Sequence, residues 1–99
     1  MKLSAEQIQE NWVEFLGNIT DYVEMPRQQK LLDFYTKYED RIILMPAANN
    51  KKYHSAFPGG YVDHVNRVVK GALAMSDVWE SFGCDMTTFT QEELVFSAI

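Results

Sequence analysis

The spacing of the large apolar residues constrains this chain more than any other feature of its sequence. These residues recur every three or four positions, which is the period of one face of an α-helix. No segment shows the convincing alternation of apolar and polar residues that a half-buried β-strand needs. Two apolar faces are clear: Ile8, Trp12, Phe15, Leu16 and Ile19, and further on Val65, Val68, Val69, Ala72, Leu73 and Trp79. The sequence therefore predicts an all-α fold, a small helical bundle.

Capping boxes mark where two of the helices begin. In this motif a Ser or Thr caps the helix and a Glu or Gln three residues later bonds back to it. Ser4 with Gln7 opens the first helix, and Thr90 with Glu93 opens the last one, "QEELVFSAI". The pair Gly17-Asn18 leaves open a bend or a break within the first helix.

Prolines and glycines bound the two helices in between. Pro26 suits the first position of a second helix because its missing N–H would have been unpaired there anyway. Pro46 ends whatever helix the segment "DRIILM" continues, and an ordered loop follows. A long helix is expected from about Tyr61 to Phe82, with Gly83 as its stop. The buried candidates of the second helix are Leu31, Leu32, Phe34, Tyr35 and Tyr38.

Length and composition bound the class of protein. Ninety-nine residues make one small domain, and a formal net charge of −5 argues against binding nucleic acid through a broad basic surface. The single cysteine, Cys84, cannot form an intrachain disulfide, which fits a reducing compartment. The N-terminus lacks the apolar region of a signal peptide, and no apolar run approaches the roughly 20 residues that span a bilayer. We therefore expect a cytoplasmic protein with no membrane partner.

Both histidines lie in one stretch, "NNKKYHSAFPGGYVDHVNRVVKGA". His54 and His64 flank the turn Pro58-Gly59-Gly60, and Arg67 follows His64 by one helical turn, within reach of a phosphate bound at that helix start. Spacing alone does not make a metal site, which needs at least three protein donors. A histidine near a helix start is also commonly a hydrogen-bonded polar residue, so both interpretations stay open at this point.

The same stretch resembles the entry to the HD domain of metal-dependent phosphohydrolases. It is most similar to the branch found in certain bacterial 3′→5′ exoribonucleases and related phage proteins. The resemblance spans roughly residues 40–82, so residues 1–39 are interpreted as N-terminal helices and residues 40–99 as the start of the HD core. The matching elements are Pro46-Ala47-Ala48, Lys52, His54-Ser55-Ala56, Gly59-Gly60, Tyr61-Val62, Asp63 and His64.

The resemblance implies a role for each of these site residues. His64 takes the place of the first metal ligand, which the family projects from a helix into the centre of a bundle. His54, Lys52 and Arg67 become candidates for binding substrate phosphate, and Pro58-Gly59-Gly60 becomes the turn that aims His64. The implied cofactor is a divalent metal ion (Mn, Mg, Fe, Ni or Zn). The implied substrate is a nucleotide or a nucleic-acid phosphoester.

The chain departs from the family pattern at two points. Ser55 stands where the family has the second histidine of a pair. The His-Asp dipeptide and the final Asp that complete the metal site are absent, and "EELVFSAI" resembles the helix that precedes that dipeptide. We therefore expect this chain to be the front part of a longer enzyme, inactive as these 99 residues alone.

The alternative is a protein that performs no chemistry. A small helical bundle that leaves apolar helix faces exposed buries them by association. In this interpretation the chain is a helical interaction module, and we expect a homo-oligomer. The sequence does not identify a substrate in either case.

Overall fold

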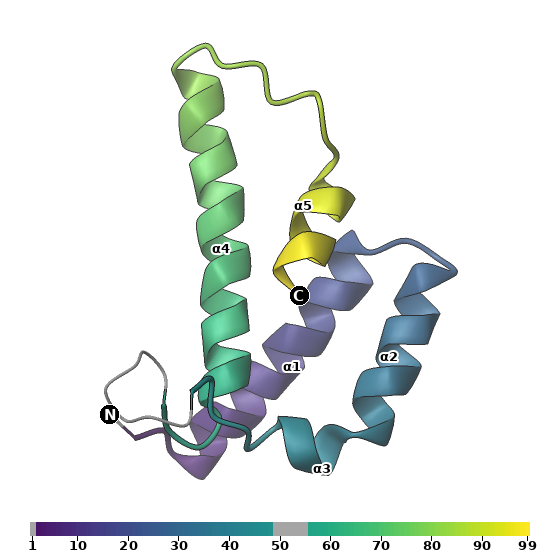
Figure 1. Ribbon diagram of the computed structural model, residues 1–99, viewed down its shortest axis with the longest axis vertical. Helices are drawn as coiled ribbons and strands as arrows, with labels where there is room; N and C mark the ends of the chain where they lie inside the picture. Colours follow the sequence, from purple (N-terminus) through teal and green to yellow (C-terminus); the bar gives the residue numbers. More distant parts are fainter. Residues whose placement is uncertain (1, 49–55) are drawn as a thin grey trace.

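The computed structural model describes residues 2–48 and 56–99, and in these ranges every regular element is a helix. In chain order they are α1 (Ala5–Tyr22), α2 (Arg27–Lys37), α3 (Glu39–Ile42), α4 (Gly60–Ser81) and α5 (Gln91–Ala98). Figure 1 shows α4 upright, α1 crossing beside it, and α2 on the far side of α1. The all-α prediction is confirmed.

Helix α1 begins where the capping box places it. The Gln7 backbone N–H donates to Ser4 Oγ at 3.1 Å, and the Ser4 N–H donates to Gln7 Oε1 at 2.9 Å. The helix then continues through Gly17 and Asn18 to Tyr22 without a break. Phe15 and Ile19, on either side of that pair, are both fully buried, so packing keeps this segment helical.

Helix α2 begins one residue later than the proline predicts. Pro26 is the cap residue, and Arg27 is the first helical residue. The helix ends at Lys37 because Tyr38 leaves helical geometry, with φ −108° and ψ 19°. The next residues form a separate single turn, α3, which stops at Ile42, before Pro46.

One hydrophobic core joins all five helices. Its buried members are Trp12, Phe15, Ile19, Val23, Tyr35, Ile42, Val62, Val65, Val69 and Val95. Trp12 stacks on Phe15 with ring centroids 5.5 Å apart, and Phe15 meets Tyr35 edge-on at 4.8 Å. Because α1 and α4 both supply this core, residues 1–39 and 40–99 do not fold as independent units.

The core covers only part of the predicted apolar faces. Phe34 on α2 is about half exposed, as is Trp79 on α4. The last turns of α4 rise above the other helices (Figure 1) and end at Ser81. Gly83, two residues further on, has a φ of 89° and is the left-handed stop that the sequence predicts. Across residues 2–48 and 56–99, no helix combines the length and the apolar character needed to cross a membrane.

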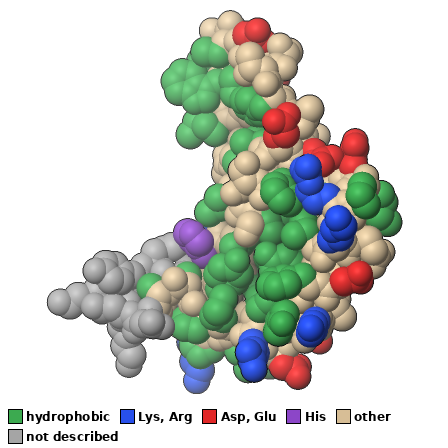
Figure 2. Space-filling model, turned by 45° about the vertical axis from the view of Figure 1, so that its right-hand side comes forward, with side chains coloured by type: hydrophobic (Ala, Val, Ile, Leu, Met, Phe, Trp, Pro, Cys, Tyr) green, Lys and Arg blue, Asp and Glu red, His purple; other side chains and the backbone are tan. Residues whose placement is uncertain are grey.

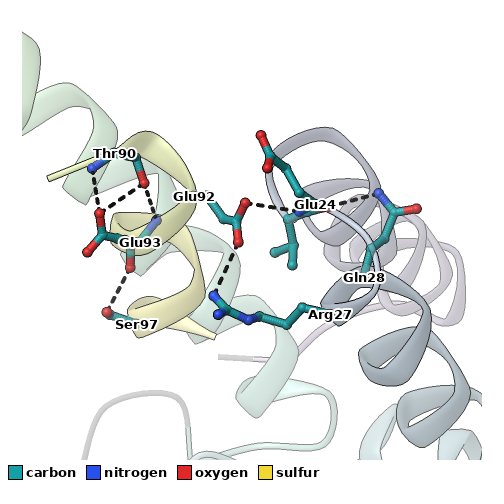
Figure 3. A network of polar contacts seen from close by, with 8 residues as sticks. Glu24, Arg27, Gln28, Thr90, Glu92, Glu93 and Ser97 are labelled. Carbon is teal, nitrogen blue, oxygen red and sulfur yellow. Dashed lines mark hydrogen bonds and ion pairs between the residues drawn. The ribbon is translucent and has the colours of Figure 1, made fainter.

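One carboxylate links the first turn of α5 to the junction of α1 and α2, beside the core contact that Val95 makes. Glu92 Oε1 accepts from the Arg27 guanidinium at 3.1 Å, and Glu92 Oε2 accepts from the Glu24 backbone N–H at 3.2 Å (Figure 3). The same guanidinium lies 4.7 Å from the centre of the Phe96 ring. The capping box predicted at Thr90 and Glu93 is also present. These contacts fix where α5 begins and which way it faces.

Candidate functional site at the start of α4

The turn before α4 has a conformation that requires glycine. Gly59 caps the helix with φ 82°, in the left-handed region, and Gly60 is the first helical residue. A Cβ atom on Gly59 would come within 2.9 Å of Ile8 Cγ1 on α1. The backbone of this turn therefore packs directly against the first helix, and the direction of α4 is set by that contact.

Two backbone hydrogen bonds fix the start of α4 to the residues that follow α3. The Gly59 N–H donates to the Leu44 carbonyl oxygen at 3.1 Å, and the Tyr61 N–H donates to the Met45 carbonyl oxygen at 2.9 Å. The Gly60 N–H donates to the Phe57 carbonyl oxygen at 2.8 Å. These amides, which at many helix starts bind anions, are already occupied by carbonyl groups here.

Asp63 is buried at the α1–α4 contact and is paired on both oxygens. Asn11 Nδ2 donates to Asp63 Oδ1 at 3.2 Å, and Arg67 Nε donates to Asp63 Oδ2 at 2.9 Å. The Arg67 side chain remains more than half exposed. Arg67 is therefore held beside the helix start by Asp63, with the rest of its guanidinium facing solvent.

Asn66 is the second buried polar residue of this contact, and it is not among the site residues that the sequence predicts. Its Nδ2 donates to the Asn11 carbonyl oxygen at 2.9 Å, and its Oδ1 accepts from Asn18 Nδ2 at 3.3 Å. The available signal was the position of Asn66 between Val62 and Val69 on an apolar helix face. An amide at such a position needs a partner inside the protein.

His64 is half-buried and does not belong to the hydrophobic core. Successive helix residues point about 100° apart, so His64 lies on nearly the opposite side of α4 from the buried Val62. The resemblance implies an imidazole aimed into the centre of the bundle. The register of α4 instead places His64 on the side of the helix away from the face that packs on α1.

The described residues do not by themselves fit a bound metal ion. Among residues 2–48 and 56–99, no three His, Cys, Asp or Glu side chains converge on one point. Asp63, the nearest carboxylate in sequence, already accepts hydrogen bonds from Asn11 and Arg67, one on each oxygen. His64 is thus one possible donor where a divalent ion needs at least three.

The remaining predicted site residues divide in two. Lys52 and His54 lie outside the described residues. Pro58 and Gly59 directly precede α4, and Gly60, His64 and Arg67 lie in about its first two turns.

A separate hollow lies between α4 and the segment that leads into α5. Tyr22, Leu73 and Phe89 line it together with the exposed carboxylates Asp77 and Glu80. Two carboxylates repel phosphate, so this hollow does not extend the candidate phosphate site.

Comparison with protein-family models, with curated proteins and with solved structures finds no match to this chain.

Proposed function

We propose that this chain is the N-terminal part of an HD-type metal-dependent phosphohydrolase that acts on a nucleotide or a nucleic-acid phosphoester. The observation that supports the proposal is that the first turns of α4, which include His64, are held rigidly. A left-handed glycine, a close contact with α1 and two backbone hydrogen bonds hold that start in one position. Such rigid support is what a metal-binding side chain needs.

In this proposal His64 supplies one imidazole ligand, on the face of α4 that points away from α1. Asp63 positions Arg67, and Arg67 with Lys52 and His54 binds the phosphate oxygens of the substrate. The other metal ligands come from polypeptide beyond Ile99. Because the described residues supply too few donors for a divalent ion, we assign no reaction step to this chain alone.

The test of the ligand assignment is a Mn²⁺ titration of the intact gene product by calorimetry. His64→Ala should weaken binding at least about tenfold, in line with the loss of one direct ligand. The matched control is Asp77→Ala, which removes an exposed carboxylate further along the same helix. Equal Mn²⁺ affinity for the wild type and His64→Ala would refute the assignment.

The reading frame after the codon for Ile99 supplies an independent test of the family. The proposal requires Leu-His-Asp, or a close variant, directly after that codon. A stop codon at that point in the native gene contradicts it.

A second candidate function is a helical interaction module that forms a homo-oligomer. It is favoured by the exposed apolar residues of α4, among them Met75, Trp79 and Phe82. Contiguous apolar surface of this kind is commonly buried by association. Light scattering at tens of micromolar protein tests it, and a monomer at every concentration would exclude it. For either function the cytoplasm is the proposed location, since the single cysteine, Cys84, is exposed and unpaired.

A further inference from the structure

The exposed side of α4 carries a regular apolar row, which we call the outer seam. It consists of Val68, Gly71, Met75, Val78 and Phe82, with Trp79 at its flank. The steps between successive members are three, four, three and four residues. Apart from Gly71, the seam side chains and Trp79 are between 39% and 74% exposed. Figure 2 shows hydrophobic side chains gathered on the surface at the upper end of the molecule, where α4 ends.

The outer seam is distinct from the face that α4 buries. Val69 belongs to the core and Met75 to the seam, and six residues of helix separate them by about 120° around the axis. A row that alternates steps of three and four residues is the pattern by which one helix packs along another. The seam is therefore arranged to receive a helix, and α1 and α5 leave that side uncovered.

We infer that the outer seam packs antiparallel against the outer seam of a second copy of this chain. In the antiparallel register, Val68 of one copy faces Val78 of the other, and Gly71 faces Met75. A Cβ atom on Gly71 would meet nothing within 4 Å, so the space beside it is open for the Met75 side chain of the second copy. A parallel pair would instead set Gly71 against Gly71 and leave a gap.

The helix dipoles also favour the antiparallel arrangement, because the two dipoles oppose each other in an antiparallel pair and are aligned in a parallel one.

The exposed area of the seam, if all of it is buried, reaches about the lower bound of what a dimer needs. A fully exposed aromatic side chain offers about 150–250 Å², so Phe82 and Trp79, 74% and 48% exposed, present on the order of 100–150 Å² each. With Val68, Met75 and Val78, one copy presents roughly 500 Å² and two copies roughly 1,000 Å², near the lower bound for a specific interface. The apolar area of the outer seam is thus enough for a dimer of modest affinity.

This inference rests on the second candidate function and assigns the outer seam as the surface through which the interaction module dimerises. It is tested first by cross-linking in a Cys84→Ser background, so that the introduced cysteine is the only one. Ala74 flanks the seam close to the two-fold axis of the antiparallel pair, so Ala74→Cys should form a covalent dimer with a short bismaleimide. Lys30→Cys, at an exposed site on α2, is the matched control and should stay monomeric. Val68→Cys should cross-link poorly, because Val68 faces Val78 rather than itself.

The second test is size-exclusion chromatography with light scattering. Met75→Glu places a charge in the seam and should raise the dissociation constant of the dimer about tenfold or more. Val13→Glu makes the same change at an exposed valine on α1 and should leave association unchanged. Circular dichroism checks that each variant keeps its helices, and the cross-linking result does not depend on Met75→Glu folding.

The outcomes separate the two proposals. A wild-type monomer at tens of micromolar overturns both the interaction module and the seam. A dimer that survives Met75→Glu, or that cross-links at Lys30→Cys but not at Ala74→Cys, leaves the interaction module standing and overturns the seam. Efficient cross-linking of Val68→Cys overturns the antiparallel arrangement.

Discussion

Asn66 on α4 donates its side-chain amide to the backbone carbonyl oxygen of Asn11 on α1, at 2.9 Å and across 55 positions of sequence. Asn11 in turn donates to Asp63, so one asparagine of α1 contacts two buried polar residues of α4. Apolar contacts between helices tolerate small shifts, but hydrogen bonds of this kind are satisfied in one alignment only. The three residues therefore set how α1 and α4 are aligned along their axes.

Asn66→Ala should lower the free energy of unfolding by about 1–3 kcal/mol, because it removes both hydrogen bonds that the buried Asn66 side chain makes to α1. Asn18→Ala is the matched control: it removes only the longer hydrogen bond of the network, 3.3 Å, from a half-buried residue, and should cost less than Asn66→Ala. Urea unfolding followed by circular dichroism measures both. Equal losses for the two variants would show that Asn66 does not set the alignment.

Gly59→Ala and Gly17→Ala should change stability in opposite directions. At Gly59 a methyl group meets both a left-handed backbone and the Ile8 side chain, so the variant should lose about 1–3 kcal/mol. At Gly17, inside α1, the added Cβ meets nothing within 4 Å, and alanine should gain about 0.5–1 kcal/mol by its higher helix propensity. Thermal unfolding of the two variants beside the wild type distinguishes them. A Gly59→Ala variant more stable than the wild type would contradict this prediction.

Stability should fall at high pH through one tyrosine. Burial, with smaller contributions from the nearby Tyr61 hydroxyl, raises the pKa of Tyr35 from 10.0 to about 12. A pKa that is higher in the folded than in the unfolded chain favours folding below the unfolded pKa, and this advantage is lost as the pH rises from about 10 to about 12. Unfolding at pH 8, 10 and 11.5 measures the loss.

Tyr35→Phe is the control for this pH dependence. It keeps the ring that packs edge-on against Phe15 but has no group to ionise. Its stability should decline less than that of the wild type between pH 10 and 12. Parallel declines in the two proteins would mean that other groups cause the loss.

The Arg27–Glu92 pair should contribute modestly to stability. It lies 3.1 Å apart with the Arg27 side chain about half exposed, and pairs of this kind are worth about 0.2–1 kcal/mol. A double-mutant cycle of Arg27→Ala and Glu92→Ala in low salt should give a coupling energy in that range, reduced at 1 M salt. A coupling that does not change with salt would indicate that packing of Arg27 on the Phe96 ring dominates.

Local signals predicted the helices well because they act within a few residues. Ser4 with Gln7, Thr90 with Glu93, and Gly83 each lie at the boundary that the sequence assigns to them. The sequence patterns did not predict the break at Tyr38, where φ of −108° and ψ of 19° separate α2 from α3. Periodicity likewise could not show that Val65 is buried while Val68 and Trp79 are exposed. That distinction depends on which helices are present to cover each side of α4.

The candidate site was predicted less completely than the fold. The sequence identified His64 and Arg67 by residue type and spacing, but it could not show that Asp63 is shared between Asn11 and Arg67. The Asn11–Asp63 contact joins positions 52 residues apart, although the Asp63–Arg67 pair is a local one, four residues along the same helix. The side of α4 on which His64 lies also follows from the contact with α1, which no local pattern encodes.

The hydrogen bonds from Gly59 to Leu44 and from Tyr61 to Met45 close the chain on itself on both sides of residues 46–58. A stretch whose two ends are tied together in this way can be lengthened, shortened or exchanged at little entropic cost, since the helices on either side keep their places. The start of α4 is therefore held at Gly59 and Tyr61 by the residues that follow α3, whatever the length of the connection between them.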